Sequence, residues 1–279
     1  MKNIIKITKM QGLGNDFVVI DYDEYLKCGL EMAELAKKIC DRNFGIGADG
    51  MIIPNLKENT ADIGWFFYNS DGTTAQMCGN GMRCFAKYVY DKGYVDKTKF
   101  SVKTLAGIIQ PEILENGLVK VDMGVPILEN SKIPFVGQSK KLQIADRIFE
   151  INPVSMGNPH CVIFTDENPL ELAKKYGPLI EIHTDFPEKT NVEFVKIISP
   201  TEIEMRVWER SCGITLACGT GACASVVSGI LNNLTQNKVK VNLLGGTLTV
   251  EWQGYKDNLK EHVFMLGSAN YVFNANFYL

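Results

Sequence analysis

Two short segments of the sequence combine a cysteine with closely spaced glycines. Residues 77–84 read MCGNGMRC and residues 217–223 read ACGTGAC, so Cys78 and Cys218 each begin a Cys-Gly-x-Gly motif, about 140 positions apart. A cysteine thiolate can act as a base or a nucleophile, and its pKa controls its reactivity. Glycines directly after the cysteine let a ligand approach the backbone closely. The motifs are therefore candidates for one chemical site that uses two thiols.

Each motif leads into a segment with the apolar spacing of a helix. Apolar residues recur at i, i+3, i+4 and i+7 in both segments: Met82, Phe85, Ala86 and Val89 in the first, and Cys223, Val226, Val227 and Ile230 in the second. The first pattern ends at Gly93, a typical C-terminal stop. We therefore expect two buried helices, each with a cysteine at its start.

The start of a helix can bind an anion. Its first backbone N–H groups have no partner within the helix, and the helix dipole favours negative charge there. The same field favours a thiolate over a thiol. We predict that amides at the two helix starts hold one substrate carboxylate, with a thiol on each side of the carbon that bears it. These amides belong to Gly79, Asn80, Gly219 and Thr220.

Two thiols on opposite faces of one carbon can invert its configuration. One thiolate would remove the proton while the opposite thiol delivers another. The helix amides would stabilise the charge that spreads onto the carboxylate. This chemistry explains why one chain carries the motif twice.

The motifs belong to a longer internal repeat. GNDFVVI at 14–20 corresponds to GNPHCVIF at 157–164, and WFFYNSDG at 65–72 corresponds to MRVWERSCG at 205–213, which sets Asn69 opposite Glu209. With the cysteine motifs, three matches follow in the same order. The repeat predicts two similar halves that face each other across a cleft, with a boundary near residues 124–126.

Both halves are rich in predicted strands. Runs of Val, Ile, Phe and Tyr between turn residues predict strands at 4–9, 17–21, 64–68, 118–123, 161–164, 192–198, 202–207, 238–242 and 247–252. One more helix is predicted over 31–41. The fold class is therefore mixed α/β (α+β) in two domains.

Composition narrows the function classes. The chain has 279 residues and a net charge of −3, with no polybasic block, so nucleic acid is not an expected partner. No apolar run approaches the roughly 20 residues of a membrane helix, and MKNIIKITKM alternates like a strand rather than a signal peptide. We therefore expect a cytoplasmic protein with no membrane contact, whose eight cysteines are mostly free thiols.

The remaining cysteines and the glycine-rich loop have plainer interpretations. Cys28, Cys40, Cys84, Cys161 and Cys223 are expected to be small buried apolar residues, whereas Cys212 stays open. A disulfide between the motif cysteines is expected only in an oxidised, inactive form. A zinc site is not favoured, because the chain has three histidines and no Cys-x-x-C. GIGADG at 45–50 lacks the Lys-Ser/Thr of a phosphate loop.

Several blocks, spread over nearly the whole chain, resemble the diaminopimelate epimerase family. They are KMQGLGNDFVVID, DRNFGIGADG, NSDGTTAQMCGNGMR, GNPHCVIF, TNVEFV and WERSCGITLACGTGACAS. The resemblance implies an epimerase that needs neither pyridoxal phosphate nor metal and interconverts LL- and meso-diaminopimelate, on the route to lysine and peptidoglycan.

The same resemblance implies an architecture. Two domains would be related by a pseudo-twofold axis, each a curled mixed sheet around a central helix, with the active site in the cleft between them. The expected domains are 1–125 with 268–279, and 126–267. The family allows a homodimer.

The resemblance also assigns roles to individual residues. Cys78 and Cys218 match the two catalytic thiols, while His160 and Glu209 match residues that tune them; a purely structural histidine is the alternative at 160. Arg210 matches the guanidinium that pairs with the distal carboxylate. Substrate contacts are implied for Asn15, Asn69, Asn158 and Asn191, together with Glu209 and the four residues of the helix starts.

Four positions depart from the family pattern, and other functions stay open. Thr73 replaces a usual Ser, Ser211 a usual Gly, Ile214 a frequent Glu, and Gly50 a polar residue found in some members. A different racemase on the same scaffold, such as a histidine or proline racemase, is one alternative. A non-catalytic binding protein or a thiol redox protein is another.

Overall fold

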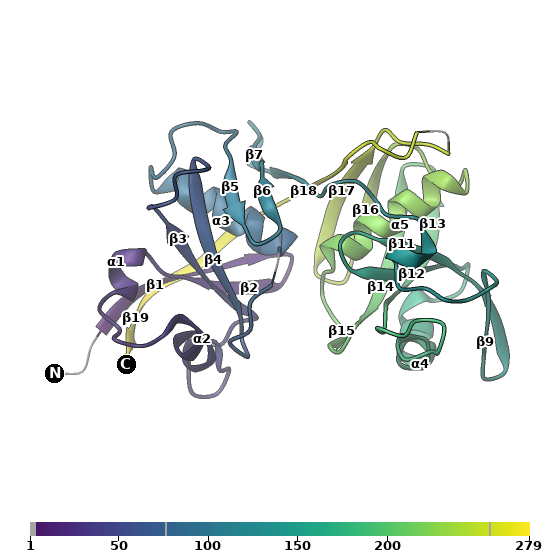
Figure 1. The fold of residues 1–279 in the computed structure, drawn as a ribbon, viewed down its shortest axis with the longest axis horizontal. Helices are drawn as coiled ribbons and strands as arrows, with labels where there is room; N and C mark the ends of the chain where they lie inside the picture. The colour runs from purple at the N-terminus through teal and green to yellow at the C-terminus, as the bar shows by residue number, and fades with distance from the viewer. Residues whose placement is uncertain (1–3, 76, 257) are drawn as a thin grey trace. The chain divides into compact units, whose positions relative to one another are not determined.

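The computed structural model describes residues 4–75, 77–256 and 258–279 (Figure 1). The chain divides into two compact units. Unit 1 comprises Met1–Val121 and Gly267–Leu279, and unit 2 comprises Asp122–Leu266. Strand β8 (Val119–Asp122), which pairs with β7 (Glu112–Ile113), contains the first boundary.

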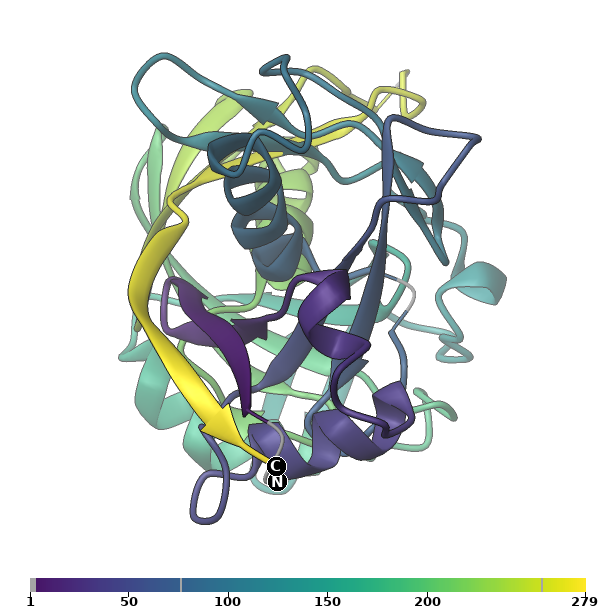
Figure 2. The ribbon, with the colours of Figure 1, turned by 90° about the vertical axis from the view of Figure 1, so that its left-hand side faces the viewer.

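Unit 1 is built on a seven-stranded sheet with the order β19-β1-β2-β3-β4-β5-β6. The C-terminal strand pairs antiparallel with the N-terminal one, and Figure 2 shows the yellow β19 running beside the purple β1. The strands are β1 (Ile4–Gly12), β2 (Asn15–Val19), β3 (Gly50–Asn55), β4 (Ile63–Asn69), β5 (Val102–Thr104), β6 (Gly107–Ile109) and β19 (Asn270–Tyr278).

In the part of unit 1 that the structure describes, three helices accompany this sheet: α1 (Tyr22–Tyr25), α2 (Met32–Cys40) and α3 (Gly79–Asp91). Helix α3 contacts β1, β2 and β3 and is buried along most of its length. Its apolar residues Met82, Phe85, Ala86 and Val89 are all fully buried. Helix α2 buries Leu35 and Ile39 and contacts β3 and β4. The apolar spacing predicted α3, and α2 matches the further helix that was predicted over 31–41.

Unit 2 contains a second mixed sheet, with β11, β12, β13, β14, β16, β17 and β18 in that order. A short strand, β15, pairs with β14, and β9 and β10 form a separate hairpin. The strands are β9 (Lys141–Ile144), β10 (Arg147–Glu150), β11 (Asn152–Ser155), β12 (Pro159–Phe164), β13 (Asn191–Ser199), β14 (Glu202–Glu209), β15 (Gly213–Ile214), β16 (Lys238–Leu243), β17 (Gly246–Trp252) and β18 (Val263–Gly267).

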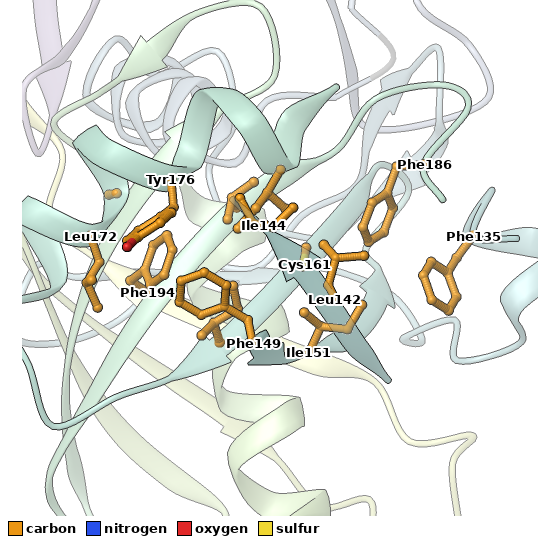
Figure 3. Packing of buried hydrophobic residues seen from close by; sticks show 14 of the residues in the cluster. Phe135, Leu142, Ile144, Phe149, Ile151, Cys161, Leu172, Tyr176, Phe186 and Phe194 are labelled. Atoms are coloured by element: carbon orange, nitrogen blue, oxygen red, sulfur yellow. The ribbon is translucent and has the colours of Figure 1, made fainter. Parts of the chain in front are cut away.

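The helices of unit 2 are η1 (Asn130–Lys132), α4 (Pro169–Glu181) and α5 (Gly219–Leu231). Leu172 and Tyr176 of α4 pack against Phe149 and Phe194 in the core shown in Figure 3. The rings of Phe149 and Tyr176 meet edge to face with centroids 4.9 Å apart. Helix α5 contacts β11, β12, β13, β14 and β17, and Val226 and Val227 within it are fully buried.

The two units share one strand order. In unit 1, β1–β2 is antiparallel, β2–β3 parallel, β3–β4 antiparallel and β4–β5 parallel, with α2 before β3 and α3 before β5. In unit 2 the same sequence of pairings joins β11, β12, β13, β14 and β16, with α4 and α5 at the corresponding places. The mixed α/β class with two sheet-rich domains is confirmed.

The predicted strands and helices are all present, but several elements were not predicted. Helix α4 is the largest of them, although Asn168 and Pro169 form a typical start: the Asn168 side chain accepts hydrogen bonds from the N–H groups of Leu170 and Glu171. Gly177 and Pro178 inside the helix obscure its spacing. Among the described residues, no helix is long and apolar enough to cross a membrane.

Candidate active site

Cys78 caps the helix that follows it. It precedes the first residue of α3, and its sulfur accepts a hydrogen bond from the N–H of Gly81 at 3.4 Å. This is a cap of the kind that serine or aspartate usually provides. The half-buried side chain lies at the start of the helix, as the motif predicted, and its sulfur itself accepts one of the N–H groups there.

A carboxamide and a carboxylate support Cys78 from outside the helix. The thiol lies 3.9 Å from Asn15 Oδ1, which also accepts a hydrogen bond from Asn80 Nδ2 at 3.1 Å. Asn15 Nδ2 in turn donates to Asp49 Oδ2 at 2.6 Å. Asp49 is paired with Arg42 at 2.8 Å. We call Asn15, Asp49, Cys78 and Asn80 the Cys78 cluster, in which Asp49 determines which end of Asn15 faces the sulfur.

Cys218 caps α5 in the same way. Its sulfur accepts a hydrogen bond from the N–H of Gly221 at 3.4 Å and lies 3.6 Å from Thr220 Oγ1. Unlike Cys78, it is nearly fully buried, with 5% of its surface exposed. The repeat therefore produces the same local geometry twice, in surroundings of different polarity.

A line of hydrogen bonds leads from Cys218 into the interior of unit 2. Asn158 Nδ2 donates to Thr220 Oγ1 at 3.3 Å, and Asn158 Oδ1 lies 3.0 Å from His160 Nε2. His160 Nδ1 lies 2.7 Å from Glu193 Oε1, and both of these side chains are fully buried. We call Asn158, His160, Glu193, Cys218 and Thr220 the Cys218 cluster.

Glu209 adds a second carboxylate near Cys218. Its Oε1 accepts a short hydrogen bond from Thr215 Oγ1. Burial raises the pKa of Glu209, although hydrogen bonds from Thr215 and Cys218 and the nearby His160 oppose the rise. Burial also raises the pKa of Cys218 well above its ordinary value, and the charges of Glu209 and Glu193 add to this effect. At Cys218 the surroundings therefore favour the thiol, whereas the helix start alone predicted a thiolate, because burial and the two carboxylates outweigh the helix N–H groups.

The corner after β14 carries Arg210. Asn191 binds backbone on both sides: its Nδ2 donates to Pro159 O at 2.8 Å, and its Oδ1 accepts from the Arg210 N–H at 2.9 Å. Arg210 Nη1 donates to Glu188 O at 3.3 Å. In this arrangement, Asn191 holds the backbone that positions Arg210.

A buried carboxylate braces the same corner. Glu181 accepts hydrogen bonds from Trp208 Nε1 at 2.7 Å and from the Ser211 N–H at 2.9 Å. Burial raises the pKa of Glu181, but these two bonds and the charge of Lys189 outweigh it, so that the pKa lies below its usual value. Ser211 has a φ of 64°, the left-handed region that favours glycine. Glycine, the residue that the resemblance implies at this position, would adopt this conformation without strain.

Asn69 ends β4 as Glu209 ends β14, which matches their pairing in the repeat. Asn69 Nδ2 donates to Thr73 Oγ1 at 3.0 Å, and that hydroxyl donates to Asp71 Oδ1 at 2.6 Å. A serine could make both bonds, so the change to threonine is mild. A Cβ atom at Gly50 would lie 2.8 Å from Tyr68 O. Gly50 therefore leaves no room for a polar side chain without a shift of the strands.

Three supporting carboxylates were not predicted from the sequence: Asp49, Glu181 and Glu193. Each reaches the cysteine motifs or Arg210 through contacts between residues distant in the sequence. Asp49 and Glu193 each bind a predicted site residue directly, and both lie inside blocks that resemble the family. Their position within those blocks was the signal that could have identified them as site residues. Among the described residues, no group of three or more His, Cys, Asp and Glu side chains is placed to hold a metal ion.

Comparison with known proteins decides the family. The family model described as diaminopimelate epimerase matches residues 7–129 and 153–272. The chain belongs to the diaminopimelate epimerase family. Diaminopimelate epimerase from Desulfitobacterium hafniense is 48% identical over 281 residues, with 97% of each chain covered. The one from Carboxydothermus hydrogenoformans is 47% identical over 280 residues and covers 99% of this chain and 100% of its own.

The fold also occurs in more distant proteins. The Bacillus anthracis phenazine biosynthesis protein of the PhzF family superposes with a TM-score of 0.73 at 16% identity, with both chains fully covered. At this identity the likeness shows the fold alone. As a member of the diaminopimelate epimerase family, the chain is an isomerase, an amino-acid epimerase whose place in lysine biosynthesis follows from the family.

Proposed function

We propose that this member of the diaminopimelate epimerase family inverts the α-carbon of LL-diaminopimelate to the meso isomer with Cys78 and Cys218 as the two proton-transfer groups. One thiolate removes the α-proton while the other thiol delivers a proton to the opposite face. The observation that carries the proposal is the duplicated cap: each sulfur accepts the N–H of the third residue of its helix at 3.4 Å.

The helix starts supply what the carbanion needs. We propose that the N–H groups of Gly79, Asn80, Gly219 and Thr220 bind the α-carboxylate and stabilise the charge that moves onto it. The absence of side chains at the glycines and the helix dipoles support this assignment. Removal of one such donor typically lowers kcat about 100-fold or more.

Side chains outside the helices complete the substrate site in this proposal. Asn15 and Asn158 each lie beside one cysteine, and Glu209 and His160 adjust the proton affinity of Cys218. Arg210 binds the distal carboxylate, for which the planar guanidinium is suited. Asn69 and Asn191 contact the distal end of the substrate or hold the residues that do.

A proton-exchange assay tests the activity and its alternatives together. The protein is incubated with LL- or meso-diaminopimelate, proline or histidine in deuterated water, and loss of the α-proton signal is followed by NMR. We expect exchange and interconversion with diaminopimelate alone, and a large rise in KM for Arg210→Leu. Exchange with proline or histidine at comparable rates would identify another racemase, whereas no exchange with any of them would contradict the proposal.

The location and the assembly are also proposals. We propose that the protein works in the cytoplasm. Its cysteines are free in this structure, and the proposed thiol chemistry requires a reducing compartment.

We propose a homodimer formed through β19, an edge strand that exposes Tyr271, Val272 and Phe273. Sedimentation of the parent and of Val272→Lys tests the dimer: a parent that sediments as a monomer at micromolar concentration would contradict it.

A further inference from the structure

The buried Glu193–His160 pair has no counterpart in the other unit. Strand pairing sets His160 opposite Asn191 in unit 2 and Phe17 opposite Gly50 in unit 1. Phe17 therefore corresponds to His160, and Ile52, two residues after Gly50, corresponds to Glu193. Phe17 is 1% exposed and Ile52 is fully buried. The same two positions are thus apolar in the unit that contains Cys78 and ionisable in the unit that contains Cys218.

The pair also explains the second glycine of the Cys218 motif. A Cβ atom at Gly221 would lie 2.7 Å from Glu193 Oε1 and 3.2 Å from the Cys218 sulfur. The carboxylate and the sulfur thus lie on the same side of Gly221, and the missing side chain makes room for both. Among the described residues, Glu193 Oε2 has no hydrogen-bond partner. A carboxylate kept in this costly position is expected to have a role.

The hydrogen-bond partners fix where the hydrogens lie. His160 presents one ring nitrogen to Glu193 Oε1 and the other to Asn158 Oδ1, so both nitrogens face oxygen atoms. Asn158 Oδ1 can only accept, so His160 Nε2 carries a hydrogen. A hydrogen also lies between His160 Nδ1 and Glu193 Oε1, because two bare lone pairs would repel each other at 2.7 Å.

The direction of these bonds continues to the sulfur. With its Oδ1 bound to His160, Asn158 donates through Nδ2 to Thr220 Oγ1. The Thr220 oxygen then accepts one bond and keeps its own hydrogen for the Cys218 sulfur, 3.6 Å away. A donated hydroxyl favours the thiolate over the thiol. Burial and the neighbouring carboxylates oppose the thiolate, so Cys218 needs this support whenever it acts as the base.

We propose that Glu193 is a positioning residue for Cys218. Glu193 keeps a hydrogen on His160 Nε2, and Asn158 and Thr220 then direct a hydroxyl hydrogen at the sulfur. This inference deepens the proposed function and rests on it. Glu193 belongs to the line of contacts that ends at Cys218, so it governs only one of the two proton transfers. The titratable groups packed around the pair are Cys161 on β12, Glu209 on β14 and Cys218 on α5.

Glu193→Gln tests the proposal without substrate. The glutamine has the same shape but holds no shared proton, so His160 can carry its one hydrogen on either nitrogen. We expect alkylation of Cys218 by iodoacetamide to slow about tenfold at neutral pH, with its pH midpoint about one unit higher. Alkylation of Cys78, quantified on its own peptide in the same sample, should change less than twofold.

A matched variant and a second substitution separate positioning from a loss of structure. Glu202→Gln makes the same change at the far end of β14 and should leave both cysteines unaffected. Thr220→Val interrupts the line, so Glu193→Gln should add nothing further in that background. Unchanged alkylation of Cys218 in Glu193→Gln would overturn the inference. So would a Glu193→Gln substitution that slows alkylation equally in the parent and in the Thr220→Val background.

Nitrogen NMR gives an independent reading of His160. The chain has three histidines, so labelling with ¹⁵N-histidine yields few signals to assign. We expect Nε2 of His160 to carry a hydrogen in the parent protein and a mixture of tautomers in Glu193→Gln. A parent His160 without a hydrogen on Nε2 would overturn the inference. If Cys218→Ser still epimerised diaminopimelate, the proposed function itself would fail, whatever the alkylation rates.

Discussion

Replacement of Gly221 by alanine should destabilise the protein, whereas the same change at Gly81 should not. The two glycines occupy the same position after Cys218 and Cys78. A Cβ atom at Gly221 would lie 2.7 Å from Glu193 Oε1, but one at Gly81 would have its nearest contact, a ring carbon of Phe67, at 3.2 Å. Because Glu193 is fully buried, it can make room only by leaving His160.

The expected size follows from the bonds involved. Loss of a buried hydrogen bond to a charged group costs roughly 1.5–3 kcal/mol. Exchange of glycine for alanine within a helix returns about 1 kcal/mol. The free energy of unfolding should therefore fall by about 0.5–2 kcal/mol for Gly221→Ala. For Gly81→Ala the helix gain and the mild crowding by Phe67 should leave it within about 0.5 kcal/mol of the parent.

Urea unfolding followed by circular dichroism measures both variants, and turnover gives a second reading. A displaced Glu193 should also lower kcat of Gly221→Ala by about 10- to 100-fold, since a misplacement of about 1 Å caused away from the reacting atoms can cost about 100-fold. Equal destabilisation by the two alanines would refute the reasoning, because only one of them meets a carboxylate. An unaffected Gly221→Ala would refute it as well.

Three further predictions concern residues that brace the site. Asp49→Ala should free the carboxamide of Asn15 and lower kcat/KM about tenfold, a loss of about 1.4 kcal/mol; unchanged kinetics would show that Asp49 does not position Asn15. Ser211→Gly should raise the free energy of unfolding by about 0.5–1 kcal/mol. The change relieves a left-handed φ in the folded state, although it also increases the conformational entropy of the unfolded chain. A lower free energy of unfolding in urea would count against this prediction. Glu181 has a lowered pKa, so it stabilises the fold above its ordinary pKa near 4.5, and this contribution disappears as the pH falls through the lower, folded value. Glu181→Gln should therefore lose about 1–2 kcal/mol at neutral pH and progressively less in acid, and a constant difference at all pH values would exclude the ionised bond to Trp208 as the cause.

The local parts of the site could be predicted from the sequence. The cysteine caps depend on residues within four positions of each other, so the motif and the apolar spacing after it were sufficient. The correspondence of Asn69 with Glu209 followed from the repeat, because each ends its strand before a turn. The left-handed backbone conformation of Ser211 was indicated only by the glycine that the resemblance implies at this position.

The supporting contacts could not be predicted, because strand pairing creates them. Glu193 lies 33 positions from His160 and meets it only after β12 and β13 align in parallel. Asp49 reaches Asn15 across the equivalent pair of strands, β2 and β3. Alternation of buried and exposed residues does not reveal a carboxylate that points into a core. Helix α4 was missed for a different reason, since Gly177 and Pro178 hide its period.

Isomer-resolved proton exchange by the two serine variants tests the central claim most directly. Cys78→Ser and Cys218→Ser are each incubated with LL- or meso-diaminopimelate in deuterated water, and exchange and inversion are measured separately. We predict that neither variant inverts the α-carbon and that each exchanges the α-proton of only one isomer, a different one for each variant. Inversion by either variant, or exchange of the same isomer by both, would contradict a mechanism with one thiol on each face.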